Sequence, residues 1–350
     1  MTSTSEREPG LSPAPGPALV SIGALRTAAE ALEGVAVRTP LLDIPALAAQ
    51  LGVPVAAKCE QLQPVGAFKI RGAYTAISRI PPAERARGVI TYSSGNHGQA
   101  VAMAARLLGT HAVIVMPERA PAIKVAGVKR LGGEVVFAGN SSAERYEAAR
   151  ALASERGLAM VPPYESLDVI AGQGTCGLEI LESRPEVETI LVPVGGGGLI
   201  AGISAAVAAL KPSVRVVGVE PEGAPKLARA LEAGRPVKLG LAQSLADGLL
   251  PLSVGELPFA VLSGVVREAV QVSETEITAA VRFLYQTMDL VVEPSGAVTT
   301  AALLTGRVRP TGSTVVLVSG GNVDPELFSR LVTSHEARSV SPGQAPGTIR

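Results

Sequence analysis

The chain has 350 residues, 47% of them hydrophobic and 18% charged, which is enough for one large domain or two of ordinary size. Lysine plus arginine equals aspartate plus glutamate at 31 each, and this balance, without any basic stretch, argues against nucleic acid as a partner. No apolar run approaches the roughly 18 residues needed to cross a bilayer. We therefore expect a soluble protein without a membrane partner.

The two ends of the chain and its cysteines indicate a cytoplasmic protein. Residues 1–18 are rich in serine, proline and glycine and lack an apolar core, so we expect a disordered segment and not a signal peptide. The tail over 335–350 has the same character and the same expectation. Cys59 and Cys176 are far apart in the sequence, which fits a reducing compartment better than a disulfide framework.

Between the ends, strand-like and helix-like segments alternate along the chain. The expected strands are 55–59, 88–91, 111–116, 134–137, 189–194, 214–220, 265–272 and 313–319. The expected helices are 97–108, 122–131, 142–156, 199–210 and 274–288. Such alternation predicts right-handed βαβ crossovers and a mainly parallel sheet. Prolines at 162–163 and glycines at 172–174 suggest a domain boundary in that part of the chain.

Four glycine-rich turns follow expected strands, at 66–72, 93–98, 195–198 and 319–322. Ligands of open parallel sheets bind outside the carboxyl ends of the strands. A glycine loop at the start of a helix also offers backbone N–H groups and the positive end of the helix dipole to an anion. The tetraglycine at 195–198 is therefore a candidate phosphate-binding site. One such loop alone would indicate only a tight turn. Four of them at one edge of one sheet predict a binding site.

Lys69 is the candidate nucleophile of this site. It is one of seven lysines and follows the apolar Phe68, between Gly66 and Gly72, at the start of an expected helix. Partial burial and a helix N-terminus both disfavour the ammonium form, which leaves a nucleophilic amine. Taken without these neighbours, it would be an ordinary surface lysine.

The tetraglycine also fits a different kind of site. Gly196, Gly198 and Ala201 satisfy the dinucleotide pattern G-x-G-x-x-A, and Glu220 ends the next strand at the distance that this pattern requires. A nicotinamide-dependent oxidoreductase is therefore the alternative. The other three loops favour the first interpretation, because a dinucleotide site has no need of a lysine framed by glycines. The three histidines lack the spacing of a zinc site.

The four motifs, in this order, resemble those of the serine/threonine dehydratase and serine racemase family, which are fold-type II pyridoxal-phosphate enzymes. The resemblance covers about residues 25–327. It implies an α/β fold similar to the tryptophan synthase β subunit, with two open parallel-sheet domains and the active site between them. The large domain would comprise 19–87 and 164–334, and the small, substrate-binding domain 88–163, which closes on the substrate.

The resemblance also implies a role for each motif residue. Lys69 would hold pyridoxal phosphate covalently and then remove the substrate's Cα proton. The other cofactor contacts would be Phe68 against the ring, Asn96 at the 3′ oxygen, Gly195, Gly196, Gly197, Gly198 and Leu199 at the phosphate, and Ser319 at the pyridine nitrogen. The substrate carboxylate would be received by Ser93, Ser94, Asn96 and His97. Ser94, which the racemase branch shares, is a second catalytic candidate on the face of Cα opposite Lys69.

A neutral hydroxyl at the pyridine nitrogen does not stabilise a protonated ring, which favours rapid loss of a β-hydroxyl. The resemblance therefore implies dehydration and deamination of a small β-hydroxy amino acid, such as L-threonine or L-serine, to a 2-oxo acid and ammonia. Serine racemase and 3-hydroxyaspartate dehydratase are the alternatives. A relative that has lost its chemistry is a more distant one, which the intact Lys69, Asn96 and Ser319 disfavour. We expect a homodimer, as is common in the family.

One departure from the family concerns a metal ion. In metal-binding members an acid, a backbone carbonyl and a second acid follow the strand that ends here at Glu220. Glu220 and Ala224 fit the first two positions, but Lys226 occupies the third, and an ammonium cannot bind a cation, so a divalent metal is doubtful. Glu220 could equally be a solvated strand-end carboxylate. Too few residues follow Asn322 for a regulatory domain, so we expect no feedback through one.

Overall fold

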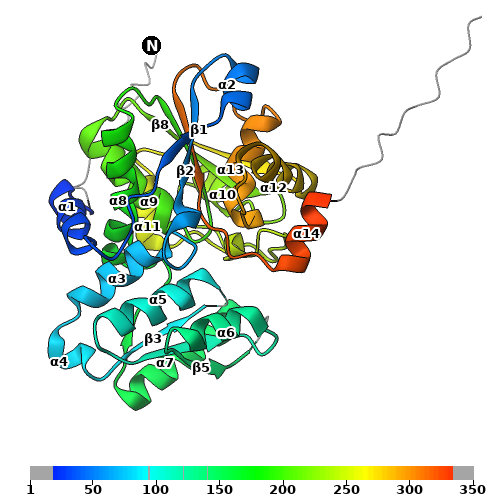
Figure 1. The fold of residues 1–350 in the computed structure, drawn as a ribbon. Helices are drawn as coiled ribbons and strands as arrows, with labels where there is room; N and C mark the ends of the chain where they lie inside the picture. The colour runs from blue at the N-terminus through cyan, green and yellow to red at the C-terminus, as the bar shows by residue number, and fades with distance from the viewer. Residues whose placement is uncertain (1–18, 94, 121, 140, 334–350) are drawn as a thin grey trace, which may run out of the picture.

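The computed structural model describes residues 19–333 except 94, 121 and 140, and the expected disordered ends lie outside these residues. The described chain contains two parallel-sheet α/β units, one above the other in Figure 1, with α3 (Lys69–Arg79) between them. None of the described helices is both long enough and apolar enough to span a membrane.

The larger sheet has six strands in the order β1-β2-β10-β7-β8-β9, parallel except for β1. Its strands are β1 (Leu41–Asp43), β2 (Val55–Cys59), β7 (Thr189–Pro193), β8 (Arg215–Pro221), β9 (Glu268–Val272) and β10 (Thr314–Val318). The helices of this unit are α1 (Ile22–Ala31), α2 (Pro45–Leu51), α8 (Leu167–Ser183), α9 (Gly198–Leu210), α10 (Lys226–Ala233), α11 (Glu256–Leu262), α12 (Glu274–Met288), α13 (Pro294–Leu304) and α14 (Pro325–Thr333). Two 3₁₀ turns, η1 (Glu60–Leu62) and η2 (Asp247–Leu249), complete it.

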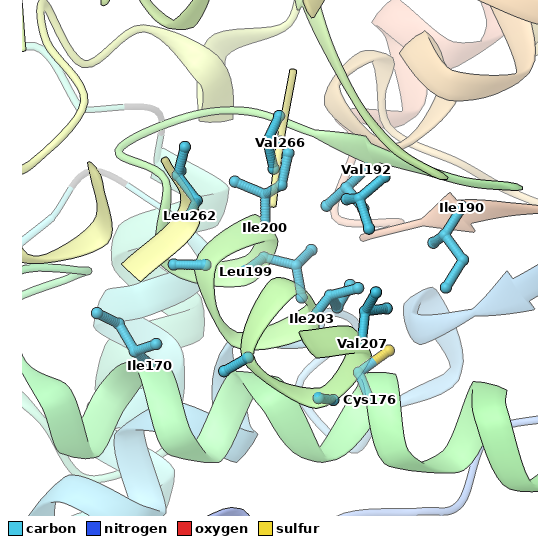
Figure 2. Close-up of a cluster of buried hydrophobic side chains, with 14 of the residues drawn as sticks. Ile170, Cys176, Ile190, Val192, Leu199, Ile200, Ile203, Val207, Leu262 and Val266 are labelled. Atoms are coloured by element: carbon cyan, nitrogen blue, oxygen red, sulfur yellow. The ribbon is translucent and has the colours of Figure 1, made fainter. Parts of the chain in front are cut away.

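Both faces of this sheet are buried, which is why its central strands β7 and β10 are apolar after their first threonine. Ile190 and Val192 of β7 belong to the core on the side of α8 and α9, which Figure 2 shows, whereas Leu191 belongs to the opposite core beneath α12 and α13. The strands therefore divide their side chains between two cores, as a doubly covered parallel sheet requires.

The smaller sheet has four parallel strands in the order β5-β4-β3-β6. They are β3 (Val89–Tyr92), β4 (Ala112–Met116), β5 (Glu134–Phe137) and β6 (Ala159–Met160). The helices of this unit are α5 (Asn96–Leu107), α6 (Ala122–Arg130) and α7 (Ser142–Arg156), and the short helix α4 (Pro82–Arg85) precedes β3. The proposed limits of the small domain, 88–163, enclose all four strands.

Two expectations are corrected by this topology. The loop at 93–98 follows β3, so the four glycine-rich turns belong to two sheets and not to one. The glycines at 172–174 lie inside helix α8 and mark no boundary. A Cβ on Gly172 would lie 2.7 Å from Gly72 Cα, and one on Gly202 would lie 2.5 Å from Ile170 O and 2.8 Å from Gly174 Cα. These glycines let α8 pack closely against α3 and α9.

Gly202→Ala should therefore destabilise the protein, because the added methyl group must push α8 and α9 apart. Overpacking of this kind costs about 1–3 kcal/mol, and we expect a fall in Tm of several degrees. Gly23→Ala is the matched control, since it also lies in a helix and its Cβ would meet only Ser21 Oγ at 3.6 Å. The Tm of the Gly23→Ala variant should equal or slightly exceed that of wild type. Equal Tm values for the two variants would contradict this account of the packing.

Candidate active site

A cavity of about 590 Å³ lies where the carboxyl ends of the two sheets face each other. Its wall includes residues that directly follow β3 and β4 of the smaller sheet and β7 and β10 of the larger one. Two sheets thus supply the site that a single sheet edge was expected to supply.

Every residue predicted to hold the cofactor lines this cavity. These residues are Phe68, Lys69, Asn96, Gly195, Gly196, Gly197, Gly198, Leu199 and Ser319. Ser93 and His97, predicted to bind the substrate, line it as well. Ser94 lies outside the described residues. Glu220 and Ala224 lie elsewhere, at and after the end of β8.

Lys69 begins α3 and its amine faces the cavity. The Nζ atom donates a hydrogen bond to the carbonyl of Pro163 at 3.0 Å and lies 5.1 Å from the centre of the Phe68 ring. Neither group carries a charge that would stabilise an ammonium. Burial consequently lowers the pKa of Lys69 to about 8. A substantial fraction of neutral, nucleophilic amine is therefore present near neutral pH.

The position of Lys69 is fixed by Arg71, two residues further along α3. The Arg71 side chain is 1% exposed. Its guanidinium donates to Glu60 at 2.8 Å and to Glu179 at 2.7 Å, and Lys58 joins the same group through Glu179 at 2.5 Å. Two buried cations and two carboxylates thus balance one another, and they hold the first turn of α3 against the large unit.

The tetraglycine forms the turn between β7 and α9. Gly197 has a φ of +95°, and a side chain on Gly196 would run into the ring of Tyr164. The first N–H groups of α9 have no partner within the helix and stand at its positive end. Because glycine leaves this backbone uncovered, the turn fits a phosphate group.

A chain of side-chain hydrogen bonds joins three of the motif loops. Asn96, at the start of α5, donates to Glu293 Oε1 at 2.7 Å and accepts from Asn322 Nδ2 at 2.8 Å. Asn322 also donates to the carbonyl of Val65 at 2.8 Å. A Cβ on Gly66 would lie 2.5 Å from Asn322 Oδ1, so the glycine is required there.

Glu293 is a cavity residue that the motif comparison missed. It precedes α13, which begins with Pro294, and the run Glu-Pro-Ser-Gly at 293–296 after an apolar segment was the available signal. Burial, with a further contribution from the charge of Asp247, raises the pKa of Glu293 to about 8. Its carboxyl group is therefore protonated at neutral pH.

Ser319 and His97 present uncharged groups to the cavity. Ser319 is 4% exposed, and its hydroxyl donates to the carbonyl of Ser295 at 3.4 Å. Burial and the nearby charge of Lys69 lower the pKa of His97 to about 3. His97 Nε2 lies 3.1 Å from the carbonyl of Val161, which requires a proton on that nitrogen. His97 is thus a neutral ring and cannot attract a carboxylate as a cation.

Lys124 and Asp247 form an ion pair across the cavity wall, and the sequence analysis did not identify it. Lys124 belongs to α6 of the smaller unit and Asp247 to η2 of the larger one. Both line the cavity. The pair therefore connects the two units beside the site.

The proposed metal position holds the side-chain amine of Lys226. Lys226 Nζ lies 3.3 Å from Glu220 Oε1 and 3.0 Å from the carbonyl of Ala224. Glu220 is fully buried, so the alternative of a solvated strand-end carboxylate is wrong. No cluster of three or more His, Cys, Asp or Glu side chains among the described residues could hold a metal ion. The residues at this position do not fit a divalent cation.

Residues 32–320 match the family model described as pyridoxal-phosphate dependent enzyme. The chain belongs to this family. It is 39% identical over 321 residues to the L-threonine ammonia-lyase of Thermotoga maritima, an alignment that covers 92% of this chain and 80% of that protein. It is 41% identical over 306 residues to the L-threo-3-hydroxyaspartate ammonia-lyase of a Pseudomonas species, covering 87% and 96%. The solved structure of maize serine racemase superposes with a TM-score of 0.86 at 37% identity, covering 89% and 96%.

The expected fold class, two open parallel-sheet α/β units of the fold-type II kind, is confirmed by these neighbours and by the sheet topology. The protein is an enzyme of the pyridoxal-phosphate family. Its cavity fits that cofactor: Lys69 offers an amine, the tetraglycine turn offers N–H groups to a phosphate, and Phe68 offers an aromatic face. The dinucleotide interpretation of 196–201 is not supported.

Glu293→Gln should change how stability depends on pH. The folded protein keeps a proton on Glu293 up to about pH 8, whereas the unfolded chain loses it near pH 4.5. Wild type therefore loses stability through this group as the pH rises from about 4.5 to 8, on the order of a few kcal/mol. The Tm of the Glu293→Gln variant should equal that of wild type at pH 5 and should be higher than that of wild type at pH 8 and above.

Glu276→Gln is the control for this measurement, because the pKa of Glu276 is shifted in the opposite direction to that of Glu293. Burial alone would raise the pKa of Glu276, but Arg307 and Ser273 outweigh burial and lower it. That carboxylate stabilises the folded state above its unfolded pKa, so the glutamine variant should have the lower Tm at pH 8. A Glu293→Gln variant that followed the same pattern would show that Glu293 is ionised.

Proposed function

We propose that this enzyme removes water and ammonia from a small β-hydroxy amino acid, L-threonine or L-serine, and releases a 2-oxo acid. The observation that carries the proposal is the amine of Lys69, with its lowered pKa, in one cavity with the tetraglycine turn and the neutral Ser319. The names of the relatives, threonine and 3-hydroxyaspartate ammonia-lyases, support the same type of reaction.

Pyridoxal phosphate, when bound, spreads the negative charge that develops at Cα when the substrate loses its proton. Lys69 is the base for that proton, because burial lowers its pKa to about 8, so that part of the amine is neutral near neutral pH, and because its position is fixed through Arg71. Ser319 offers a hydroxyl and no charge at the position proposed for the pyridine nitrogen. A neutral partner there does not prolong the life of the negative charge, which favours prompt loss of the β-hydroxyl.

The substrate carboxylate is proposed to bind at the start of α5. Asn96 and His97 form the first turn of this helix, whose leading N–H groups lack partners within the helix. Ser93 lies just before it and accepts a hydrogen bond from Gly95 N at 3.2 Å. Since His97 is neutral, the attraction would come from the helix N-terminus and the Ser93 hydroxyl, and from Lys124, whose Nζ would lie 3.7 Å from a Cβ on Gly95.

A 3-hydroxyaspartate substrate is the second candidate, and the charges of the cavity wall favour it. With Lys124 beside the first carboxylate, a second cation of the smaller unit, Arg145, also lines the cavity. A second carboxylate on the substrate could use the charge of Arg145, and threonine and serine have no such group. We also propose a cytoplasmic homodimer, in keeping with the expectation from the sequence.

Lys69→Ala should abolish covalent attachment of the cofactor. In wild type, borohydride should fix the cofactor to the peptide that contains Lys69, and the attachment rate of cofactor-free protein should rise with pH through a midpoint near 8. The exposed Lys129 provides the control, because Lys129→Ala should retain both properties. Attachment at another lysine, or a midpoint near the ordinary value of 10.5, would overturn the assignment.

Ser94→Ala should separate two reactions at Cα. Racemisation needs a proton donor on one face and a base on the other, whereas elimination needs only Lys69. We expect wild type to form pyruvate and a little D-serine from L-serine, and the variant to lose D-serine formation while it keeps most of the elimination. Parallel loss of both activities would make Ser94 a binding residue.

The same assay across L- and D-serine, threonine and 3-hydroxyaspartate identifies the substrate by its kcat/KM. A preference for L-threo-3-hydroxyaspartate over L-threonine would select the second candidate. No 2-oxo acid from any of them would refute the proposed reaction.

A further inference from the structure

The Lys226–Glu220 pair is buried away from the cavity and takes no part in the proposed reaction. Both side chains are 0% exposed. Isolated charges are very costly inside a protein, and lysine is almost never fully buried without a partner. Burial raises the pKa of Glu220 and lowers that of Lys226, while each charge opposes this effect on the other. The cost of burying these two groups therefore indicates that the pair has a structural role.

Its surroundings have the composition of a cation site. Glu220 is the second-last residue of β8, and Ala224 lies in the turn before α10, so a carboxylate oxygen and a backbone carbonyl both face Lys226 Nζ. The other side of Glu220 is occupied by the start of α10, since Leu227 N and Ala228 N donate to it at 2.8 and 3.1 Å. Carboxylate and carbonyl oxygens are the ligands that hard cations prefer.

We propose that the Lys226 ammonium is a covalently attached cation that takes the position of a metal ion, so that the turn at 221–226 is ordered without any bound metal. A tethered ammonium brings one positive charge and three donors. It satisfies the two oxygens that face it, and it cannot be removed by a chelator or by dilution. This inference goes beyond the proposed reaction and does not depend on its substrate.

The turn that Lys226 orders supports one wall of the cavity. Gln243 N donates to the carbonyl of Gly223 at 3.2 Å, and a Cβ on Gly223 would run into the carbonyl of Gln243. The segment that contains Gln243 continues into η2, and its residues 240–242 and 247–252 line the cavity. Removal of the ammonium should therefore disorder the turn at 221–226, and the contact with Gln243 should pass this change to the segment that lines the cavity.

The test is the Tm of the holoenzyme of Lys226→Ala in salts of different cations. In choline chloride, whose cation is too large to enter, Tm should fall on the order of 5–10 °C, because one partner of a buried pair has been removed. Ammonium, methylammonium or Mg²⁺ should restore at least half of the loss, since each can occupy the space beside Glu220 and Ala224. Glu220→Gln/Lys226→Ala, which lacks the carboxylate, should gain nothing from these ions.

Wild type supplies a second test that holds even if the variant does not fold. Its Tm should change by no more than about 1 °C on treatment with EDTA or with millimolar Mg²⁺ or Ca²⁺, and metal analysis should find no divalent ion bound in stoichiometric amount. The inference fails if wild type loses stability to a chelator or binds one divalent ion per chain. It also fails if Lys226→Ala is as stable as wild type, or if choline restores it as well as ammonium does. All these readouts are independent of turnover, so they separate this inference from the proposed reaction.

Discussion

The side-chain amide of Asn96 is the contact on which the geometry of the site depends. It joins the smaller unit, through the start of α5, to two loops of the larger unit, because one end donates to Glu293 and the other accepts from Asn322. Replacing either partner would leave a partly buried amide with an unsatisfied end, which is expensive. Gly66 and Gly320 are glycines for the same reason: a Cβ at either place would collide with Asn322 or with Glu293. Three motifs that are far apart in the sequence therefore contact one another, and these contacts restrict which residues each motif can have.

The buried cations of the large unit each have a carboxylate partner in the described structure, whereas the partly buried Lys69, which faces the cavity, has none. Lys58 is paired with Glu179 and Lys226 with Glu220, and Arg71 contacts both Glu60 and Glu179. Lys69 has only the carbonyl of Pro163. A nearby carboxylate would favour the ammonium form, so its absence is what allows burial to lower the pKa. Arg71 positions the same helix without lending its charge to the amine, because its guanidinium is already balanced by two carboxylates.

The strands and the glycine loops could be predicted from the sequence because both signals are local. Apolar runs such as 189–194 and the loops that follow them need no knowledge of distant residues, and the helix at 142–156 was predicted with its observed bounds. The assignment of loops to sheets could not be predicted, since β3 and β7 have the same local pattern but belong to different sheets. The glycines at 172–174 were misread because close helix packing and turns select the same residue. Glu293, Lys124 and Asp247 were missed because their roles come from contacts across more than 100 residues.

The two links between the units differ in how easily water can replace them. Asp247 is 50% exposed, so its ion pair with Lys124 exchanges readily for hydration and is worth at most about 1 kcal/mol. Glu293 is 5% exposed and its carboxyl group keeps a proton, so its bond with Asn96 has little access to solvent. Separation of the units on the Lys124 side therefore costs less than separation on the Asn96 side. In the binding mode proposed above, a substrate carboxylate at the start of α5 would add a negative charge beside Lys124 and would compete with Asp247 for the same cation. On this proposal, binding and release of substrate would be coupled to the weaker link, and the contact that aligns the motif loops would be left intact.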